Sequence, residues 1–331
     1  MIASLTRRAM IPAAAGAVAA CAVSGMARAQ SSWPARPIRI VVPFAPGASV
    51  DTIARVLAAR LAARLGVPVV VENRAGAGGM TGTAYVAGQP PDGHVLLFTA
   101  NPFVIAPLLV PANQRPPYDP AKDLQPIAEV ASAPMIVIVA NDLGVTTLRE
   151  LVAAARAAPQ GIAYGSGGVG TINHLAAEML ARMAEVQLLH VPYAGLGPAI
   201  TGLLGGQVKA MVGSVTSVLP LVRDGRVRAL AVTSAARSPL VPDLPTAAEA
   251  GIPGYEIEAW WGMFGPAGMP APVTGRLNAE VSALLATPEV LELLARDGAS
   301  PRPGSAQDFA RLIQSEIPRW QRLIGEAGIA Q

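Results

Sequence analysis

Residues 37–61 read PIRIVVPFAPGASVDTIARVLAARL, an apolar run followed by a turn and then a helical pattern. The run Ile38 to Val42 predicts a short strand buried on both faces, as in a parallel sheet. Apolar residues then recur at helical spacing between Ile53 and Leu65, which predicts an amphipathic helix. We expect Ser49 to be the N-cap of this helix and Asp51 to lie in its first turn, where a carboxylate favours the helix dipole.

Two further strands complete a βαβαβ unit. The second is expected at Val67 to Val71, followed by the glycine-rich turn 73–79 and a short helix. The third is expected at His94 to Phe98 and ends at the polar residues Thr99 and Asn101. Parallel strands joined by helices form one sheet with right-handed crossovers.

The same pattern occurs a second time. Residues 161–183 read GIAYGSGGVGTINHLAAEMLARM, which predicts a strand, a glycine-rich turn and a helix in the same order. Strands at Val186 to Val191 and Val208 to Val212 follow, the second ending at Gly213 and Ser214. A duplicated unit of this kind predicts an α/β protein of two lobes.

Two apolar strands outside the units offer places where the chain can cross between lobes. These are Met135 to Ala140 and Val227 to Thr233, and together they predict a hinge of two crossing segments. Three helices, at 273–285, 288–297 and 306–325, are expected to pack back on the first lobe. The predicted limits are 1–29 for a cleaved signal peptide, 30–130 plus 236–331 for lobe 1 and 131–235 for lobe 2.

Composition excludes several classes of protein. The 331 residues include 25 Lys and Arg against 22 Asp and Glu, and 52% are hydrophobic, which is too apolar for a disordered chain. Three of the arginines lie in the first 29 residues, where there is no acid. The remainder is electrically neutral and lacks the basic surface of a nucleic-acid-binding protein. A single cysteine, Cys21, excludes a disulfide scaffold.

The first 29 residues have the pattern of an export signal. Arg7 and Arg8 begin it, residues 9–26 carry no charge, and Ala27-Arg28-Ala29 predicts cleavage after Ala29. The arginine pair resembles a twin-arginine signal, although the export route stays open. The run Val18 to Cys21 also resembles a lipoprotein cleavage box. We expect an exported, periplasmic protein without a membrane-spanning segment after residue 29.

The turns after the strands favour an anion site. A strand-to-helix turn presents unpaired N–H groups and the positive end of a helix dipole, and one turn from each lobe could hold a carboxylate from both sides. If the two lobes face each other, these turns line a single cleft. Side chains at the far end of this cleft, Trp261 among them, would then discriminate between acids. We expect the ligand to be bound by Phe44, Gly47, Ala48, Ser49, Asp51, Thr99, Asn101, Ser166, Gly167, Gly168, Thr171, His174, Tyr193 and Ser214.

Catalytic alternatives find less support in the sequence. Residues 165–170 satisfy the G-x-G-x-x-G pattern of dinucleotide sites. In such sites an acidic residue at the end of the next strand binds a ribose, whereas Glu185 precedes that strand. Ser166 is not in a G-x-S-x-G motif because Tyr164 occupies the first glycine position. His174 lies four residues before Glu178 on a predicted helix, which favours a surface or supporting pair over a general base. We therefore expect no enzyme, no cofactor and no metal, with an NAD-dependent oxidoreductase as the alternative.

Taken together, these residues resemble a known family, the Bug-type solute receptors of tripartite tricarboxylate transporters. The resemblance covers the chain after residue 29 in order. It is carried by the runs PIRIVVPF at 37–44, DTIAR at 51–55, VVVENR at 69–74, PDG at 91–93, YDP at 118–120, HVPY at 190–193, LLGGQV at 203–208, LAVTS at 230–234, PT at 245–246 and GIPGY at 251–255.

The resemblance implies a two-lobed periplasmic binding fold of type II that closes on a small organic anion. It also implies delivery of that ligand to the integral membrane subunits of a transporter, with main-chain amides at 47–51 and 166–171 holding the carboxylate. An acid is frequent in the family where this chain has Gly213 and Ser214, so a ligand with an ammonium group is not expected. A sensor that presents the ligand to a membrane kinase is the alternative to transport.

Overall fold

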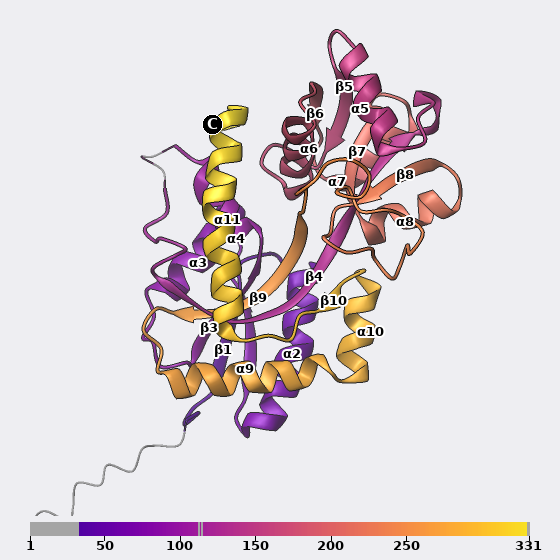
Figure 1. Cartoon of the computed structure of the whole chain (residues 1–331). Helices are drawn as coiled ribbons and strands as arrows, with labels where there is room; N and C mark the ends of the chain where they lie inside the picture. Colours follow the sequence, from indigo (N-terminus) through magenta and orange to yellow (C-terminus); the bar gives the residue numbers. More distant parts are fainter. Residues whose placement is uncertain (1–32, 112, 114, 330–331) are drawn as a thin grey trace, which may run out of the picture. The chain divides into compact units, whose positions relative to one another are not determined.

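The computed structural model describes residues 33–111, 113 and 115–329 (Figure 1). The predicted signal peptide, residues 1–29, lies outside these described residues. From Arg36 onward, the chain belongs to one compact unit. Within the described part of the chain, none of the helices combines the length and the apolar character that crossing a bilayer requires.

The first predicted βαβαβ unit is confirmed. Strand β1 (Ile38–Val42) pairs in parallel with β2 (Val69–Asn73) and with β3 (Val95–Ala100). Helices α2 (Ser49–Leu65) and α3 (Met80–Ala87) connect them. The second and third strands lie one or two residues later than predicted. The second unit is a separate test of the same sequence pattern.

The predicted N-cap of α2 is wrong by one residue. Ala48 has the extended backbone of an N-cap, so that Ser49 is the first residue of the helix. The cause is the Asp51 carboxylate, which accepts a hydrogen bond from the backbone N–H of Gly47 at 3.0 Å and so fixes the turn in place of a cap hydroxyl. Gly47 has a φ of +87°, a conformation that glycine adopts without strain.

The second predicted unit is also confirmed. Strand β5 (Ile162–Ser166) lies in parallel between β6 (Leu188–Pro192) and β7 (Ala210–Ser214). Helices α6 (Ile172–Met183) and α7 (Leu196–Leu204) connect these strands. Thr171 is the N-cap of α6, because its hydroxyl accepts a hydrogen bond from the backbone N–H of His174.

One long strand joins the two units. Strand β4 (Leu124–Ala140) pairs with β9 (Glu258–Pro266) up to Pro134, and from Met135 onward it pairs with β7 and with β8 (Val227–Val232). Among the described residues, the strand order is β2-β1-β3-β9-β4-β7-β5-β6, and β8 and β10 (Ser300–Pro301) also pair with β4. The predicted strand at Met135 was therefore only the second part of β4.

The segment predicted as the second crossing, Val227 to Thr233, contains β8, which belongs to the second sheet and pairs with the end of β4. The chain returns toward the first sheet after β8. The backbone N–H of Thr233 donates to the carbonyl oxygen of Met135 at 3.0 Å, and that of Ile257 donates to the carbonyl oxygen of Thr233 at 2.9 Å. These two bonds bring the return segment next to β4 immediately before β9 begins.

The helices that follow β9 cover the first sheet. The three predicted C-terminal helices are confirmed as α9 (Ala271–Leu285), α10 (Pro288–Arg296) and α11 (Ala306–Ala327). Helix α11 packs against β4, α4 (Pro102–Leu109) and α6, so it contacts elements of both units (Figure 1). Helices α4, α5 (Leu148–Ala157) and α8 (Val215–Arg223) were not predicted.

Aromatic side chains fix α11 to the sheet. The Phe309 ring lies 5.6 Å from the ring centre of Trp260 and 4.9 Å from that of Phe264, both on β9. It occupies the space beside Gly262, where an added Cβ would overlap the ring. The indole N–H of Trp260 donates to the buried Glu316 carboxylate on α11 at 2.7 Å. These contacts make the α11 interface part of the core.

Replacing Phe309 by alanine therefore leaves a cavity against β9. We expect Phe309→Ala to lower the free energy of unfolding by about 3–5 kcal/mol, measured by urea denaturation followed by tryptophan fluorescence. Arg311→Ala, on the exposed side of the same helix, is the control and should change it by less than about 0.5 kcal/mol. Equal effects of the two substitutions would contradict the assignment of α11 to the core.

Candidate functional site

The turn between β1 and α2 is held by the Asp51 carboxylate. Besides the Gly47 N–H, it accepts hydrogen bonds from the Asn73 side chain at 2.8 Å and from Arg55 Nε at 3.0 Å. Arg55 also forms an ion pair with the other carboxylate oxygen at 2.9 Å. These hydrogen bonds and the Arg55 charge outweigh the opposite effect of burial and lower the pKa of Asp51 to about 2. Asp51 thus stays ionised, with its charge compensated by Arg55.

The remaining N–H groups of this turn have no acceptor among the residues that the structure describes. The N–H groups of Ser49 and Val50, in the first turn of α2, cannot bond inside their own helix. Neither they nor the N–H of Ala48 donate to any residue that the structure describes. The Ser49 hydroxyl is likewise without a hydrogen bond to a described residue. Since α2 has 17 residues, its dipole adds positive potential at this end.

The turn between β5 and α6 is held by side-chain hydroxyl groups. The Ser166 hydroxyl accepts a hydrogen bond from the N–H of Gly168 at 3.1 Å, and the Thr171 hydroxyl donates to the carbonyl oxygen of Gly168 at 2.8 Å. Gly168 itself has a φ of +122°, which a residue with a side chain adopts only with strain. Both hydroxyl groups therefore fix the backbone of the turn.

The side chains of two histidines contact residues of the second turn and support it. The rings of His174 and His190 stack with their centres 3.9 Å apart, and the Tyr164 ring stacks on His190 at 4.9 Å. His190 Nε2 lies 2.6 Å from the Ser166 hydroxyl. His174 is buried, and Glu178 lies 4.0 Å from its Nε2, so the arrangement is the supporting pair rather than the surface pair of the prediction.

Both histidines are neutral at physiological pH. Burial lowers the pKa of each to about 4, and for His190 the neighbouring His174 adds to this lowering. The Nδ1 atom of His174 accepts a hydrogen bond from the N–H of Gly170 at 3.0 Å, which assigns its ring proton to Nε2. Protonation of His174 would replace this acceptor with a donor and would break the bond to Gly170.

Several N–H groups of the second turn also have no acceptor. Those of Gly167 and Val169 do not donate to any residue among the described ones, and neither does that of Ile172, the first residue of α6. The second turn therefore repeats the property of the first, with backbone donors at the start of a helix. The two turns arise from corresponding positions in the two βαβαβ units.

Helix α4 contacts glycine-rich turns of both units. A Cβ added at Gly78 would lie 3.2 Å from Ala106, and one added at Gly170 would overlap the Leu109 side chain. Ala106 and Leu109 are three residues apart on α4, which is roughly 4.5 Å along the helix axis. The glycine turn of the first unit and the β5–α6 turn of the second thus meet on one short helical segment.

Three other predicted residues are used inside the fold. The Asn101 side chain accepts a hydrogen bond from the N–H of Trp260 at 2.9 Å and donates to the carbonyl oxygen of Glu258 at 3.2 Å, so it fastens β3 to β9. The Tyr193 hydroxyl donates to the Gln207 side chain at 3.2 Å. Thr99 is fully buried opposite Gly262, and its hydroxyl has no partner among the described residues.

The remaining predicted residues lie at partly open positions. The Phe44 ring packs on Gly79, within 3.3 Å of where a Cβ would be. Ser214 ends β7, and its hydroxyl donates to Ser217 at 2.8 Å. Trp261, on β9, is 8% exposed, and its indole N–H makes no hydrogen bond to the residues described. Phe44 and Ser214 lie at or just after strand ends, whereas Trp261 is buried within β9 opposite Ala100, the last residue of β3.

Sequence reasoning did not select Arg55, Asn73, His190 or Leu109 as site residues. The spacing of four between Asp51 and Arg55 on one helix would have indicated an ion pair. His190 could have been found because β5 and β6 are parallel neighbours, so that Ser166 and the end of β6 meet at one edge. Nothing in the sequence indicates that Leu109 reaches Gly170, because this contact depends on how the two units pack.

The family follows from comparison with known proteins. A family model described as "Tripartite tricarboxylate transporter family receptor" matches residues 53–329. The chain belongs to this receptor family. The receptor is 37% identical to BugT of Bordetella pertussis over 311 residues, covering 93% of this chain and 94% of BugT. It is 42% identical over 311 residues to a UPF0065 protein of a Pseudomonas species, covering 94% and 92%.

Solved structures of relatives agree with this assignment. An R. palustris protein with adipate is 36% identical to the receptor, with a TM-score of 0.72 over 90% of this chain and 99% of that one. MatC from Rhodopseudomonas palustris with bound malate is 35% identical, with a TM-score of 0.69 over 88% and 100%. A TctC solute-binding protein from Polaromonas is 27% identical, with a TM-score of 0.81 over 89% and 100%.

These relatives confirm the predicted family, its two-lobed α/β periplasmic binding fold and the class of protein. Members of the family are periplasmic solute-binding receptors rather than enzymes. The G-x-G-x-x-G pattern at 165–170 accordingly belongs to a receptor turn, and the oxidoreductase alternative is wrong.

The neutral histidine pair predicts a dependence of stability on pH. Unfolded histidines bind protons near pH 6.5, whereas His174 and His190 do so near pH 4. The unfolded state therefore binds more protons between these values, and the free energy of unfolding falls as the pH drops from 6.5 toward 4. In His190→Gln this fall should be smaller, as measured by urea midpoints at pH 7 and pH 4.5. The same fall in both proteins would contradict the assignment.

Proposed function

We propose that the receptor captures a small organic acid between its two lobes and delivers it to the integral membrane subunits of a tripartite tricarboxylate-type transporter. The support comes from relatives of 35% and 36% identity whose structures contain malate and adipate. It also comes from the two turns, in which backbone donors lie at the N-termini of α2 and α6. Export to the periplasm through the signal peptide at residues 1–29 is part of this proposal.

In this proposal the carboxylate is held by backbone N–H groups from both turns. Those of Ala48, Ser49 and Val50 serve the first lobe, and those of Gly167 to Ile172 that lack an acceptor serve the second. Backbone amides suit a carboxylate because hydrogen bonds to an ionised acceptor are stronger than neutral ones. Asp51 then acts as a positioning residue, since its oxygens are occupied by Gly47, Asn73 and Arg55.

The second lobe's turn depends on neutral supports. Ser166, Thr171 and His174 would orient the turn rather than contact the ligand, because their polar atoms already bond to Gly168, Gly170 and His190. At the far end of the ligand, Phe44, Ser214 and Trp261 would select among acids. The absence of an acid at Gly213 and Ser214 favours a carboxylic acid without an ammonium group, because nothing there would balance a positive charge.

Closure of the lobes would occur at the two crossings. We place the limits of the second lobe in β4 between Pro134 and Met135, and in the return segment just before Ile257, where the pairing partners change. The first limit predicted from the sequence, 130, lies a few residues before this position in β4, and the second, 235, lies well before the proposed end of the lobe. Bending at a few residues of two crossing segments is the usual motion of two-lobed binding proteins. Closure would exclude water and strengthen the hydrogen bonds to the carboxylate.

A proline substitution tests the role of the backbone amides. Proline is tolerated at the first position of a helix but has no N–H, and Ala48 already has the extended backbone that a following proline requires. Ser49→Pro should therefore leave α2 intact and weaken binding of adipate roughly 10- to 100-fold, since one hydrogen bond to a charged group is worth about 1.5–3 kcal/mol. Isothermal titration calorimetry measures the change.

The matched control is Ser49→Ala, which removes the hydroxyl and keeps the N–H. It should bind adipate within about threefold of the wild-type receptor. Equal affinities of the alanine and proline variants would overturn the role of this amide. Absence of binding to adipate, malate and citrate by the wild-type receptor would overturn the proposed function.

A further inference from the structure

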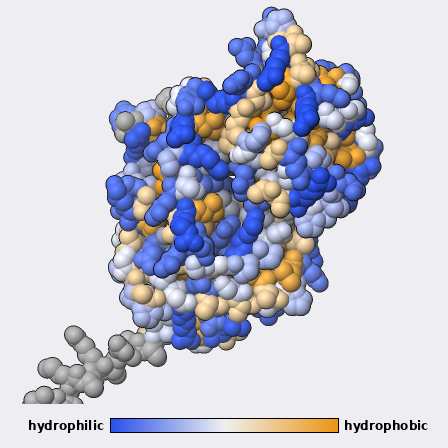
Figure 2. Space-filling view, viewed as in Figure 1, coloured by the Kyte–Doolittle hydropathy of each residue, from blue (hydrophilic) through white to orange (hydrophobic). Residues whose placement is uncertain are grey.

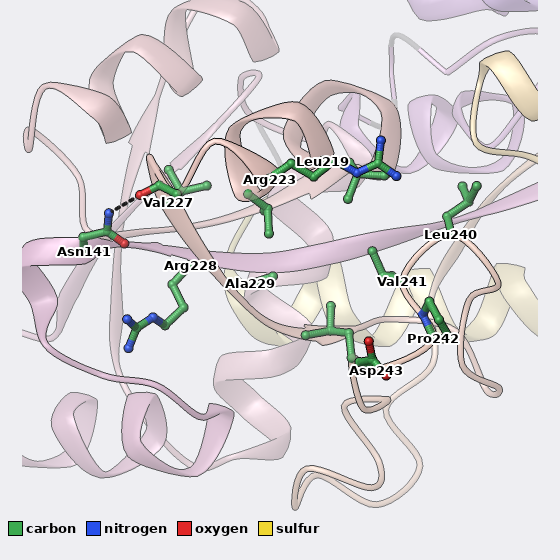
Figure 3. A pocket seen from close by; sticks show the side chains of 13 residues that line it. Asn141, Leu219, Arg223, Val227, Arg228, Ala229, Leu240, Val241, Pro242 and Asp243 are labelled. Atoms are coloured by element: carbon green, nitrogen blue, oxygen red, sulfur yellow. Dashed lines mark hydrogen bonds between the residues drawn. The ribbon is translucent and has the colours of Figure 1, made fainter.

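A cavity on the second sheet is separate from the strand-end turns. It has a volume of about 600 Å³, and none of the predicted site residues lines it. Its floor is apolar and comes from α8, from β8 and from the segment 240–244 (Figure 3). The apolar side chains are Leu219, Val222, Val227, Leu240, Val241 and Leu244.

The cavity forms at an edge of the sheet. Strand β8 is bonded to β4 on one side, while on its other side Val232 alone pairs with a described residue, through a bridge to Thr246. The first half of β8 and the segment 240–244 both line the cavity. A volume of about 600 Å³ with a mainly apolar lining lies within the range of small-molecule sites.

Apolar side chains of this lobe also reach the surface. Figure 2 shows apolar residues gathered over part of the second unit, on an otherwise largely polar face. Met183 and Leu189 are 40% and 54% exposed, and Leu240, at the rim of the cavity, is 37% exposed. The Leu240 side chain therefore extends the apolar floor of the cavity outward.

Two arginines give the rim a positive charge. Arg223 and Arg228 line the cavity together with a single carboxylate, Asp243 (Figure 3). Arg223 makes no hydrogen bond or ion pair with any residue in the described part of the chain. Arg228 forms no hydrogen-bonded ion pair there either, although its charge contributes to lowering the pKa of Glu150. The cavity thus joins an apolar floor to guanidinium groups that have few partners inside the protein.

We propose that this cavity is a second binding site, for a small organic monoanion with an apolar body, such as a medium-chain or aromatic carboxylate. The apolar body would cover the floor formed by Leu219, Val241 and Leu244. The carboxylate would pair with Arg223 or Arg228, because a guanidinium binds a carboxylate through two parallel hydrogen bonds.

The site is complete within the second lobe. All of its lining residues lie between Asn141 and Leu244, on β8, α8 and neighbouring segments of the second sheet. Binding there requires neither closure of the lobes nor the backbone donors of the strand-end turns. The inference therefore goes beyond the proposed function and stands independently of it.

Octanoate is a suitable probe, and its binding to the purified receptor is measured by isothermal titration calorimetry. The double variant Arg223→Gln/Arg228→Gln should lower the affinity for octanoate at least 10-fold. The matched control is Arg226→Gln, an exposed arginine between the two that does not line the cavity, and it should change the affinity less than twofold. The uncharged analogue octan-1-ol should bind at least 10-fold more weakly than octanoate.

A competition experiment separates this site from the strand-end turns. Saturating adipate should leave the affinity for octanoate within twofold, whereas displacement of octanoate by adipate would overturn a separate site. No binding of octanoate, or equal effects of the double variant and Arg226→Gln, would also overturn it. Failure of adipate, malate and citrate to bind, with arginine-dependent octanoate binding intact, would overturn the proposed function alone. Unchanged thermal unfolding of the variants confirms that they remain folded.

Discussion

The N–H groups at the start of an α-helix cannot bond within that helix, and in the proposed function this constraint supplies the donors that bind the carboxylate. In α2 and α6 the surrounding sequence satisfies some of these donors and leaves others. Asp51 accepts from Gly47, and His174 accepts from Gly170, so that each turn has a fixed backbone. The donors that remain point away from their helices, where the dipole favours a negative charge.

The charged groups near the turns do not cancel this preference for a negative charge. Asp51 would repel an anion if it stood alone, but Arg55 pairs with it and Asn73 bonds to it. On the second lobe the supporting groups are hydroxyl groups and neutral imidazoles, which add no charge of either sign. In the proposed function, backbone donors of this kind would recognise the carboxylate itself and would leave the choice of acid to the side chains farther out.

A single strand, β4, makes the two lobes mechanically dependent on each other. Its first part pairs with β9 and its last six residues pair with β7 and β8. Helix α11 covers the first part and also contacts α6, and α4 brings Leu109 against Gly170. In the proposed closure, rotation of one lobe would bend β4 near Met135 and change the contacts of α4 and α11.

Much of this organisation could be predicted from the sequence, because short apolar strands followed by glycine-rich turns and amphipathic helices have clear patterns. Both βαβαβ units and the C-terminal helices were found in this way. Strand β4 was only half found, since Pro126, Glu129 and Pro134 interrupt its apolar pattern while its length comes from pairing with several strands. Helix α4 was missed because it is apolar on all sides and contains prolines, so its period is ambiguous.

At the site, the sequence predicted the two turns but not the use of each side chain. Ser49 was expected to be the N-cap, but Ala48 is the N-cap and the Asp51 carboxylate accepts the hydrogen bond from the Gly47 N–H. Asn101 was expected to bind the ligand. Its side-chain amide forms hydrogen bonds with the backbone of β9, a strand that the sequence had not predicted. The hydrogen-bond partners of a polar side chain depend on which distant segments pack against it in the fold, and local sequence patterns do not contain that information.

The most direct measurement is a crystal structure of the receptor with adipate bound. The account predicts carboxylate oxygens of adipate within about 2.7–3.2 Å of backbone nitrogens from the first turn of α2 and from the β5–α6 turn in the same complex. Adipate held by one of these turns alone, or at another place in the molecule, would contradict it.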